Sequence, residues 1–152
     1  SAAKYIREQI KDAVSKGAAD IIDKINFKIA EDSNCYVSPS VLINVNHSMS
    51  FMMDETFGPS VGIMKVADEN EAAQFMNDSP YGLTACVWTS DKEFALSFGK
   101  RINTGTFFMN RCDYLDPGLA WTGVKDTGIG VTLSVLGFDH VTRAKSYHYR
   151  TV

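Results

Sequence analysis

The fold is decided by residues 61–110, which read VGIMKVADENEAAQFMNDSPYGLTACVWTSDKEFALSFGKRINTGTFFMN. Three apolar runs in this stretch have the length and composition of strands: Val61–Val66, Leu83–Thr89 opened by Tyr81-Gly82, and Thr106–Asn110. Helical spacing of apolar residues separates them. Apolar strands that alternate with helices are typical of a parallel sheet buried on both faces. The stretch therefore predicts a β-α-β-α-β unit and an α/β fold.

Capping residues mark where the two helices of this unit begin. Asp68 followed by Glu71 has the spacing of a capping box and predicts a helix over 69–77. Ser90 followed by Glu93 repeats the pattern and predicts the start of a second helix. The apolar face of that second helix, which Gly105 ends, consists of Phe94, Ala95, Phe98 and Ile102.

On the N-terminal side of this unit, residues 2–16 carry the apolar spacing of an amphipathic helix, and Gly17 follows where a left-handed cap belongs. Short strands are expected around Ile21-Ile22, Phe27–Ile29 and Tyr36–Val45, with a loop over 31–35. These elements extend the α/β pattern toward the N-terminus.

On the C-terminal side, residues 111–130 are rich in glycine and lack periodicity, which predicts a long and functional loop. Leu133, Leu136 and Gly137 indicate a short helix. The final segment, Ala144–Val152, reads as an extended strand that needs a partner edge, within the chain or in another subunit.

Composition excludes several classes of protein. The 152 residues are 45% hydrophobic and 22% charged, which predicts a folded core rather than disorder. A net charge of −3 gives no electrostatic basis for a nucleic-acid or anionic-membrane partner, and no apolar run approaches the ~20 residues of a membrane span. Because the chain begins Ser1-Ala2-Ala3, we expect a piece of a longer protein.

The cysteines and histidines do not form a metal pattern. Their positions are Cys35, Cys86, Cys112, His47, His140 and His148. An odd number of widely spaced cysteines argues against a disulfide framework and favours a reducing, cytoplasmic setting. The histidines lack ligand spacing, so we expect no metal site.

Two segments are weak candidates for chemistry. Cys112 lies two residues past a strand end, where α/β proteins place ligands, and Arg111 would lower its pKa only modestly, whereas mid-strand Cys86 is typical of a buried hydrophobe. The glycines over 123–130 resemble a phosphate loop, but the lysine precedes the glycine pair.

A third segment, residues 53–59 (MDETFGP), places two carboxylates and an aromatic ring beside a Gly-Pro turn. A solvated acidic turn is one interpretation. The alternative is a nucleoside site, because a carboxylate accepts hydrogen bonds from a ribose diol and a ring packs on a flat heterocycle.

Taken together, the motifs resemble the C-terminal part of the aldehyde dehydrogenase superfamily over essentially the whole chain. They occur in the family's order: Glu55-Thr56-Phe57-Gly58-Pro59, Asn77-Asp78, Tyr81-Gly82-Leu83-Thr84-Ala85, Gly105-Thr106 with Asn110, and Gly123-Val124-Lys125-Asp126-Thr127-Gly128. The resemblance implies a partial three-layer parallel sheet with flanking helices, in which residues 1–143 are part of the catalytic domain. It also implies that 144–152 is a tail strand that joins subunits into a homo-oligomer.

The resemblance also implies site residues. Glu55 would bind the hydroxyls of the nicotinamide ribose of NAD or NADP, and Phe57 would pack near the nicotinamide. Trp121 would line the aldehyde pocket, with Tyr114 as a second wall. The sequence departs from the family at Trp121-Thr122, where Phe-Gly is common, and at Thr127, where serine is usual, so the pocket's shape is its own.

The family's nucleophilic cysteine, its activating glutamate and its cofactor domain have no match in these residues. We therefore predict a C-terminal segment of an NAD(P)-dependent enzyme that oxidises an aldehyde to an acid, inactive when isolated. Two alternatives are open: a structural module that self-associates through its tail, and a hydrolase that uses Cys112.

Overall fold

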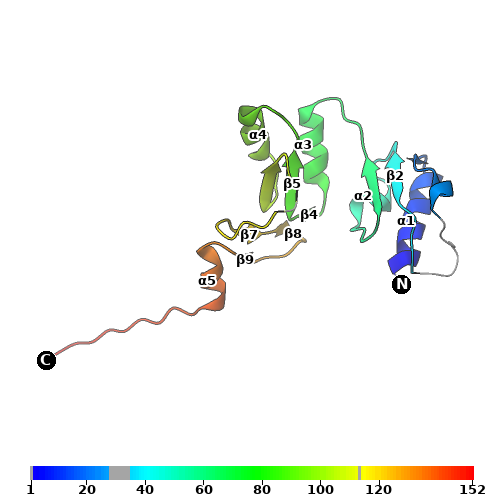
Figure 1. Ribbon diagram of the computed structural model, residues 1–152. Helices are drawn as coiled ribbons and strands as arrows, with labels where there is room; N and C mark the ends of the chain where they lie inside the picture. The colour runs from blue at the N-terminus through cyan, green and yellow to red at the C-terminus, as the bar shows by residue number, and fades with distance from the viewer. Residues whose placement is uncertain (1, 28–34, 113) are drawn as a thin grey trace. The chain divides into compact units, whose positions relative to one another are not determined.

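The computed structural model describes residues 2–27, 35–112 and 114–152. These residues form two compact units, and Figure 1 shows the elements of each. The N-terminal unit ends at Ala67 and the C-terminal unit begins at Asp68. Each unit is described by itself.

The described residues of the N-terminal unit form a long helix, a short helix and a three-stranded sheet in the order β1-β2-β3. Its elements are α1 (Ala2–Ser15), β1 (Ala19–Asp20), the 3₁₀ turn η1 (Lys24–Asn26), β2 (Ser40–Ile43), α2 (Ser50–Met53) and β3 (Ser60–Ile63). β1 runs antiparallel to β2, and β2 runs parallel to β3 with Leu42 opposite Gly62. The buried core of this unit consists of Ala13, Ala18, Leu42, Val45, Met49 and Phe51.

The predicted first helix is confirmed. α1 ends at Ser15, and Gly17 has a φ of +103°, the left-handed conformation expected of a glycine cap. The Ala18 N–H then donates to the carbonyl of Ala13 over 3.0 Å, which satisfies a carbonyl of the last helical turn.

The strand expected at Ile21-Ile22 lies two residues earlier, at Ala19–Asp20. A helical turn follows because the Asp23 carboxylate accepts the Ile25 N–H over 3.0 Å, and this cap competes with an extended chain. Phe27 closes that turn instead of starting a strand. The rest of the run 27–29, and residues 31–34 of the expected loop, lie outside the described residues.

The C-terminal unit contains two longer helices and three strand pairs. Its elements are α3 (Glu69–Asp78), β4 (Tyr81–Gly82), β5 (Thr84–Val87), α4 (Lys92–Gly99), β6 (Thr106–Met109), β7 (Trp121–Thr122), β8 (Val124–Lys125), β9 (Val131–Thr132) and α5 (Leu136–Val141). β5 pairs in parallel with β6, while β4 pairs with β8 and β7 with β9 in antiparallel fashion.

The α3 start is confirmed, and the α4 start needs a correction. Asp68 accepts the N–H groups of Asn70 and Glu71 over 2.8 and 2.9 Å. In α4 the cap is Asp91, which accepts the Phe94 N–H over 2.9 Å, and not Ser90 as the sequence predicts. Behind these caps the two helices pack with β5 and β6 through Ala72, Ala73, Met76, Ala85, Phe94, Phe98, Ile102 and Phe107.

The α/β class is confirmed, but the strands pair differently from a single run of three. β3 pairs with β2, and β5 pairs with β6. The expected strand over 81–89 is interrupted at Leu83, because β4 pairs with β8 instead of continuing into β5. β7 and β8 lie within residues 111–130, so the predicted loop contains two short strands.

The end of the chain is helical and then extended (Figure 1). α5 confirms the short helix predicted near Leu136. Residues 142–152 form neither helix nor strand, and their side chains are exposed. A partner edge for the tail 144–152 stays a prediction. Among the described residues, no helix combines the length and the apolar character that crossing a membrane requires.

Candidate functional site

Glu55 and Phe57 lie in the connection between α2 and β3, and their neighbours anchor this connection to α1. The Tyr5 hydroxyl donates to the Asp54 carboxylate over 3.0 Å. The Thr56 hydroxyl donates to the Gln9 side-chain oxygen over 3.1 Å. Two of the four consecutive side chains are therefore tied to the helix.

Gly58 brings the same connection against α1. A Cβ at Gly58 would overlap the Cδ1 atom of Ile6, so any larger residue here would require the end of that side chain to move. The glycine of the predicted motif thus has a packing role, and the turn that carries Glu55 has a defined position on α1.

Both side chains assigned to the cofactor are exposed, as is the neighbouring Asp54. Phe57 has 77% of its surface exposed, and Glu55 is exposed as well. Within the described part of the chain, the Glu55 carboxylate has no hydrogen bond or ion pair. An exposed carboxylate beside an exposed ring fits a nucleoside, since oxygen atoms for two hydroxyls and an apolar face are both available.

Tyr114 and Trp121, predicted to be pocket walls, line one hollow of about 150 Å³ in the C-terminal unit. We call this the aromatic hollow. It is lined by Thr106, Phe108, Arg111, Tyr114, Asp116, Leu119, Ala120, Trp121 and Leu133. The two residues are seven positions apart in the sequence, and the structure brings them together.

Strand pairing and one asparagine position these walls. Trp121 in β7 lies opposite Thr132 in β9, and this strand pairing fixes the backbone that carries the indole ring. Asn110 leaves β6 with a φ of +56°, and its side chain accepts the Thr89 N–H over 2.9 Å and donates to the Thr89 carbonyl over 2.8 Å. This amide clamp fixes where the chain exits β6 toward Tyr114.

Arg111 is a residue of the hollow that the sequence analysis considered only as a neighbour of Cys112. Its guanidinium carbon lies 4.0 Å from the ring centroid of Tyr114, a cation–π contact. The signal that could have found it was its place directly after Asn110, at the carboxyl end of a parallel strand.

The cysteines do not take part in this hollow. Cys112 and Cys35 are exposed, Cys86 is half-buried in β5, and all three are free thiols. The hollow's lining contains no cysteine or histidine among the described residues. Over the same residues, no group of three or more metal-ligating side chains is found. Cys112 is not among the residues that line the aromatic hollow.

The glycine-rich segment 123–130 caps a helix instead of forming a phosphate loop. The Lys125 ammonium donates to the carbonyls of Asn77 and Ser79, each over 2.8 Å, at the C-terminal end of α3. A cation at this end also interacts favourably with the helix dipole. Nearby, the Thr127 hydroxyl accepts the Gly82 N–H over 2.8 Å.

Two carboxyl groups with shifted pKa values serve structure instead of catalysis. Hydrogen bonds from the N–H groups of Glu71 and Asn70 lower the pKa of Asp68 at the α3 cap. Burial raises the pKa of Asp20, but its hydrogen bonds to Ile22, Lys24 and Ser40 and its charge attraction to Lys24 outweigh burial and lower it.

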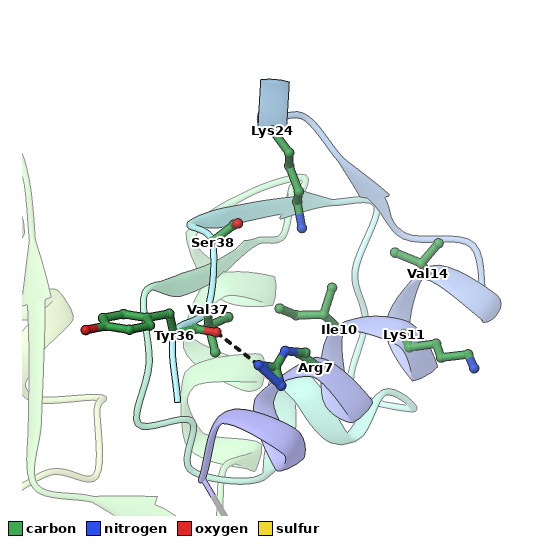
Figure 2. Close-up of a pocket in the computed structure, with 8 residues that line it drawn as sticks. All are labelled: Arg7, Ile10, Lys11, Val14, Lys24, Tyr36, Val37 and Ser38. Atoms are coloured by element: carbon green, nitrogen blue, oxygen red, sulfur yellow. Dashed lines mark hydrogen bonds between the residues drawn. The ribbon is translucent and has the colours of Figure 1, made fainter. Parts of the chain in front are cut away.

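A second concavity lies in the N-terminal unit, between α1 and residues 36–38, and measures about 270 Å³. Figure 2 shows Arg7 reaching the Tyr36 carbonyl, to which it donates over 3.0 Å. The lining residues are Arg7, Ile10, Lys11, Val14, Lys24, Tyr36, Val37 and Ser38. They include no carboxylate, thiol or imidazole.

Parallel strand pairs that pack with helices define the chain as an α/β protein of the kind that places ligands at strand ends. Comparison with known proteins makes this class specific. The model of the aldehyde dehydrogenase family matches residues 1–147, and the chain therefore belongs to that family.

Individual relatives agree with this assignment. A succinate-semialdehyde dehydrogenase (NADP+) of Deinococcus radiodurans is 33% identical over 144 residues, which are 95% of this chain and 30% of the relative. The structure of succinic semialdehyde dehydrogenase from Streptococcus pyogenes with NADP+ is 31% identical, with a TM-score of 0.78 over 90% of this chain and 30% of that one.

A Mycobacterium tuberculosis aldehyde dehydrogenase in complex with NAD+ gives a TM-score of 0.82 at 28% identity, over 93% of this chain and 29% of that one. The chain thus spans about 30% of the length of each of these three relatives. The family is established by these comparisons, whereas the roles of Glu55, Phe57, Tyr114 and Trp121 stay predictions.

Proposed function

We propose that this chain is the C-terminal part of an NAD(P)-dependent aldehyde dehydrogenase that oxidises an aldehyde to a carboxylic acid. Residues 1–143 belong to its catalytic domain, and residues 144–152 form an oligomerisation strand. Family membership and the 30% share of the relatives' length support this proposal. So do relatives whose names or structures include NADP+ or NAD+.

The observation that carries the cofactor role is the contrast among neighbouring side chains. Asp54 and Thr56 hydrogen-bond to side chains of α1, whereas the exposed Glu55 carboxylate has no hydrogen bond within the described residues. A carboxylate held at a defined place and left without a described partner fits the hydroxyls of a ribose. When bound, the nicotinamide supplies the hydride acceptor. This chain's part is to orient it through Glu55 and Phe57.

The aromatic hollow supplies substrate walls. Tyr114 and Trp121 give flat apolar surfaces that hold the organic part of an aldehyde and exclude water from it. Since no cysteine or histidine lines the hollow within the described chain, the nucleophile comes from residues outside this segment. The isolated chain is therefore inactive, and the complete gene product carries the activity.

The experiment that tests the cofactor role is Glu55→Gln in the complete gene product. Loss of a charge-assisted hydrogen bond to a ribose hydroxyl raises the Kd for NAD(P) about tenfold or more, because such a bond contributes about 1.5–3 kcal/mol. Titration calorimetry measures the Kd. Asp54→Asn is the matched control: it removes the neighbouring carboxylate, whose partner is Tyr5, and leaves the Kd within about twofold. An unchanged Kd in Glu55→Gln contradicts the role.

A second candidate function is self-association through the tail. Tyr147 and Tyr149 stack at 6.0 Å between ring centroids, and every side chain from residue 142 to the end is exposed. An extended segment of this kind adds to a sheet edge of another copy. Light scattering of the chain with and without residues 144–152 tests it: a larger species that persists after truncation contradicts a role for the tail.

The free cysteines fit a reducing, cytoplasmic setting.

A further inference from the structure

Arg111 places a positive charge at the aromatic hollow without a described partner of opposite charge. Its side chain lines the hollow beside Tyr114 and Trp121. Within residues 2–27, 35–112 and 114–152, its guanidinium has neither an ion pair nor a hydrogen bond. Its recorded contact is the Tyr114 ring at 4.0 Å. Arg111 is exposed, and within those residues no protein acceptor occupies its N–H groups.

The ring contact determines how those donors are presented. A guanidinium is planar, and a ring at 4.0 Å restricts its motion while leaving the N–H groups free to donate. Two parallel N–H groups match the two oxygen atoms of a carboxylate. The remaining lining is mostly apolar, with Phe108, Leu119 and Trp121 beside the charge.

We propose that Arg111 binds a carboxylate on the substrate, so that the enzyme oxidises aldehydes that also carry an acid group. This inference rests on the proposed function, since it names the substrate class of the same hollow. The apolar walls take the carbon chain between the aldehyde and the acid, and Arg111 takes the acid.

Charge counting favours a carboxylate over a phosphate group. Arg111 is the one cation among the described lining residues, which balances a monoanion better than a phosphate dianion. Asp116 also lines the hollow, and one of its carboxylate oxygen atoms accepts the Gly118 N–H over 2.8 Å. Because Asp116 keeps its negative charge, the test below includes an ammonium aldehyde. The hollow's volume of about 150 Å³ fits a short chain.

The test uses the complete gene product and four aldehydes of equal chain length, which end in a carboxylate, a methyl group, an ammonium or a phosphate. Values of kcat and KM are measured for the wild type, Arg111→Met and Arg111→Lys. The control is Lys145→Met, which removes a cation that also lies over a tyrosine ring, 4.9 Å from the Tyr147 centroid, but outside the hollow.

We expect the wild type to prefer the carboxylate aldehyde. Arg111→Met raises KM for that substrate about 10- to 100-fold and changes kcat little, because the lost contact is equal in ground and transition states. Arg111→Lys has a KM for that substrate between those of the wild type and Arg111→Met, since lysine keeps the positive charge but lacks the two parallel N–H groups of the guanidinium. Lys145→Met leaves all four KM values within about twofold. Circular dichroism spectra that match the wild type report correct folding of every variant.

Three results overturn the inference: equal KM for the carboxylate and methyl aldehydes in the wild type, a preference for the ammonium or phosphate aldehyde, or an unchanged KM in Arg111→Met. In each of these cases the enzyme still oxidises aldehydes, so the proposed function stands. If no aldehyde reduces NAD or NADP with the wild type, the proposed function itself has failed.

Discussion

Glu55 in the N-terminal unit and Trp121 in the C-terminal unit are assigned to ligands by the same family resemblance, yet their surroundings differ. Glu55 is exposed on a connection that α1 anchors, and no concavity encloses it among those found in the described chain. Trp121 is half-buried and shares a hollow with Tyr114 and Arg111. The Glu55 site is therefore open to solvent, whereas the Trp121 site is a hollow lined by aromatic side chains.

The difference bears on how each site would enclose a ligand. An open carboxylate needs a second surface to enclose a nucleotide, because most of a bound ligand's surface is normally buried. A hollow with aromatic walls already surrounds part of a small molecule. We therefore expect substitutions in the C-terminal unit to act on a formed site, and substitutions at Glu55 to act on one that another part of the protein completes.

Gly105→Ala has the largest expected effect on stability. It disturbs the backbone next to Trp121, which is one wall of the aromatic hollow. A Cβ at Gly105 would overlap the carbonyl oxygen of Thr122, the residue after Trp121, and this backbone atom cannot rotate away. We expect a loss of about 3 kcal/mol or more in the unfolding free energy. Both tryptophans, Trp88 and Trp121, lie in the C-terminal unit, so tryptophan fluorescence during denaturation reports on it alone.

A control variant and a second measurement test whether the destabilisation is specific to the close approach at Gly105. Gly118→Ala places its Cβ 3.3 Å from the end of the Asp116 side chain, which can move, so its effect stays within about 0.5 kcal/mol. Amide hydrogen exchange in α1 stays protected in Gly105→Ala, because the clash lies within the other unit. Equal stability of the two glycine variants would show that Gly105 does not set the close approach.

Lys125→Met has the next largest expected effect on stability. It tests whether Lys125 caps the C-terminal end of α3. It removes two charge-assisted hydrogen bonds to the carbonyls of Asn77 and Ser79, which lowers the unfolding free energy by about 1.5–3 kcal/mol. The same fluorescence denaturation measures it. Lys100→Met, which removes an exposed lysine charge near the end of α4, is the control and changes stability by less than about 0.5 kcal/mol. A similar effect of both variants would contradict the capping role.

Asp68→Asn has the smallest expected effect on stability. It tests whether the Asp68 cap makes the stability of the C-terminal unit depend on pH. Hydrogen bonds hold the pKa of Asp68 below its ordinary value of about 3.9, so its contribution to stability is complete above that value and is lost as the pH falls through the folded pKa. Asparagine keeps the cap without titrating. The acid-induced loss of stability seen by tryptophan fluorescence becomes shallower, and an identical pH profile would refute the assignment.

The sequence predicts those parts of the fold that depend on short-range chemistry. The Gly17 cap of α1 and the Asp68 cap of α3 follow from local hydrogen bonding and are confirmed. The α/β class follows from apolar runs that alternate with helices. Ser90 fails as a cap because Asp91, one position later, provides the oxygen that reaches the Phe94 N–H.

Long-range pairing is what the sequence does not predict. Leu83 interrupts an apolar run because β4 pairs with a strand more than forty positions away, a contact that periodicity does not encode. Lys125 and Arg111 are missed for the same reason: their roles depend on the α3 carbonyls and the Tyr114 ring that the fold places beside them. The aromatic pair was found through the resemblance and not through spacing.

The most direct test of the account is the rate of nicotinamide reduction by the 152-residue chain beside that of the complete gene product, with the same aldehydes and either NAD or NADP. We expect reduction by the complete protein and none by the chain, because no cysteine or histidine lines the hollow in the part of the chain that the structure describes. Reduced cofactor formed by the chain alone, shown by mass to be free of longer protein, would contradict it.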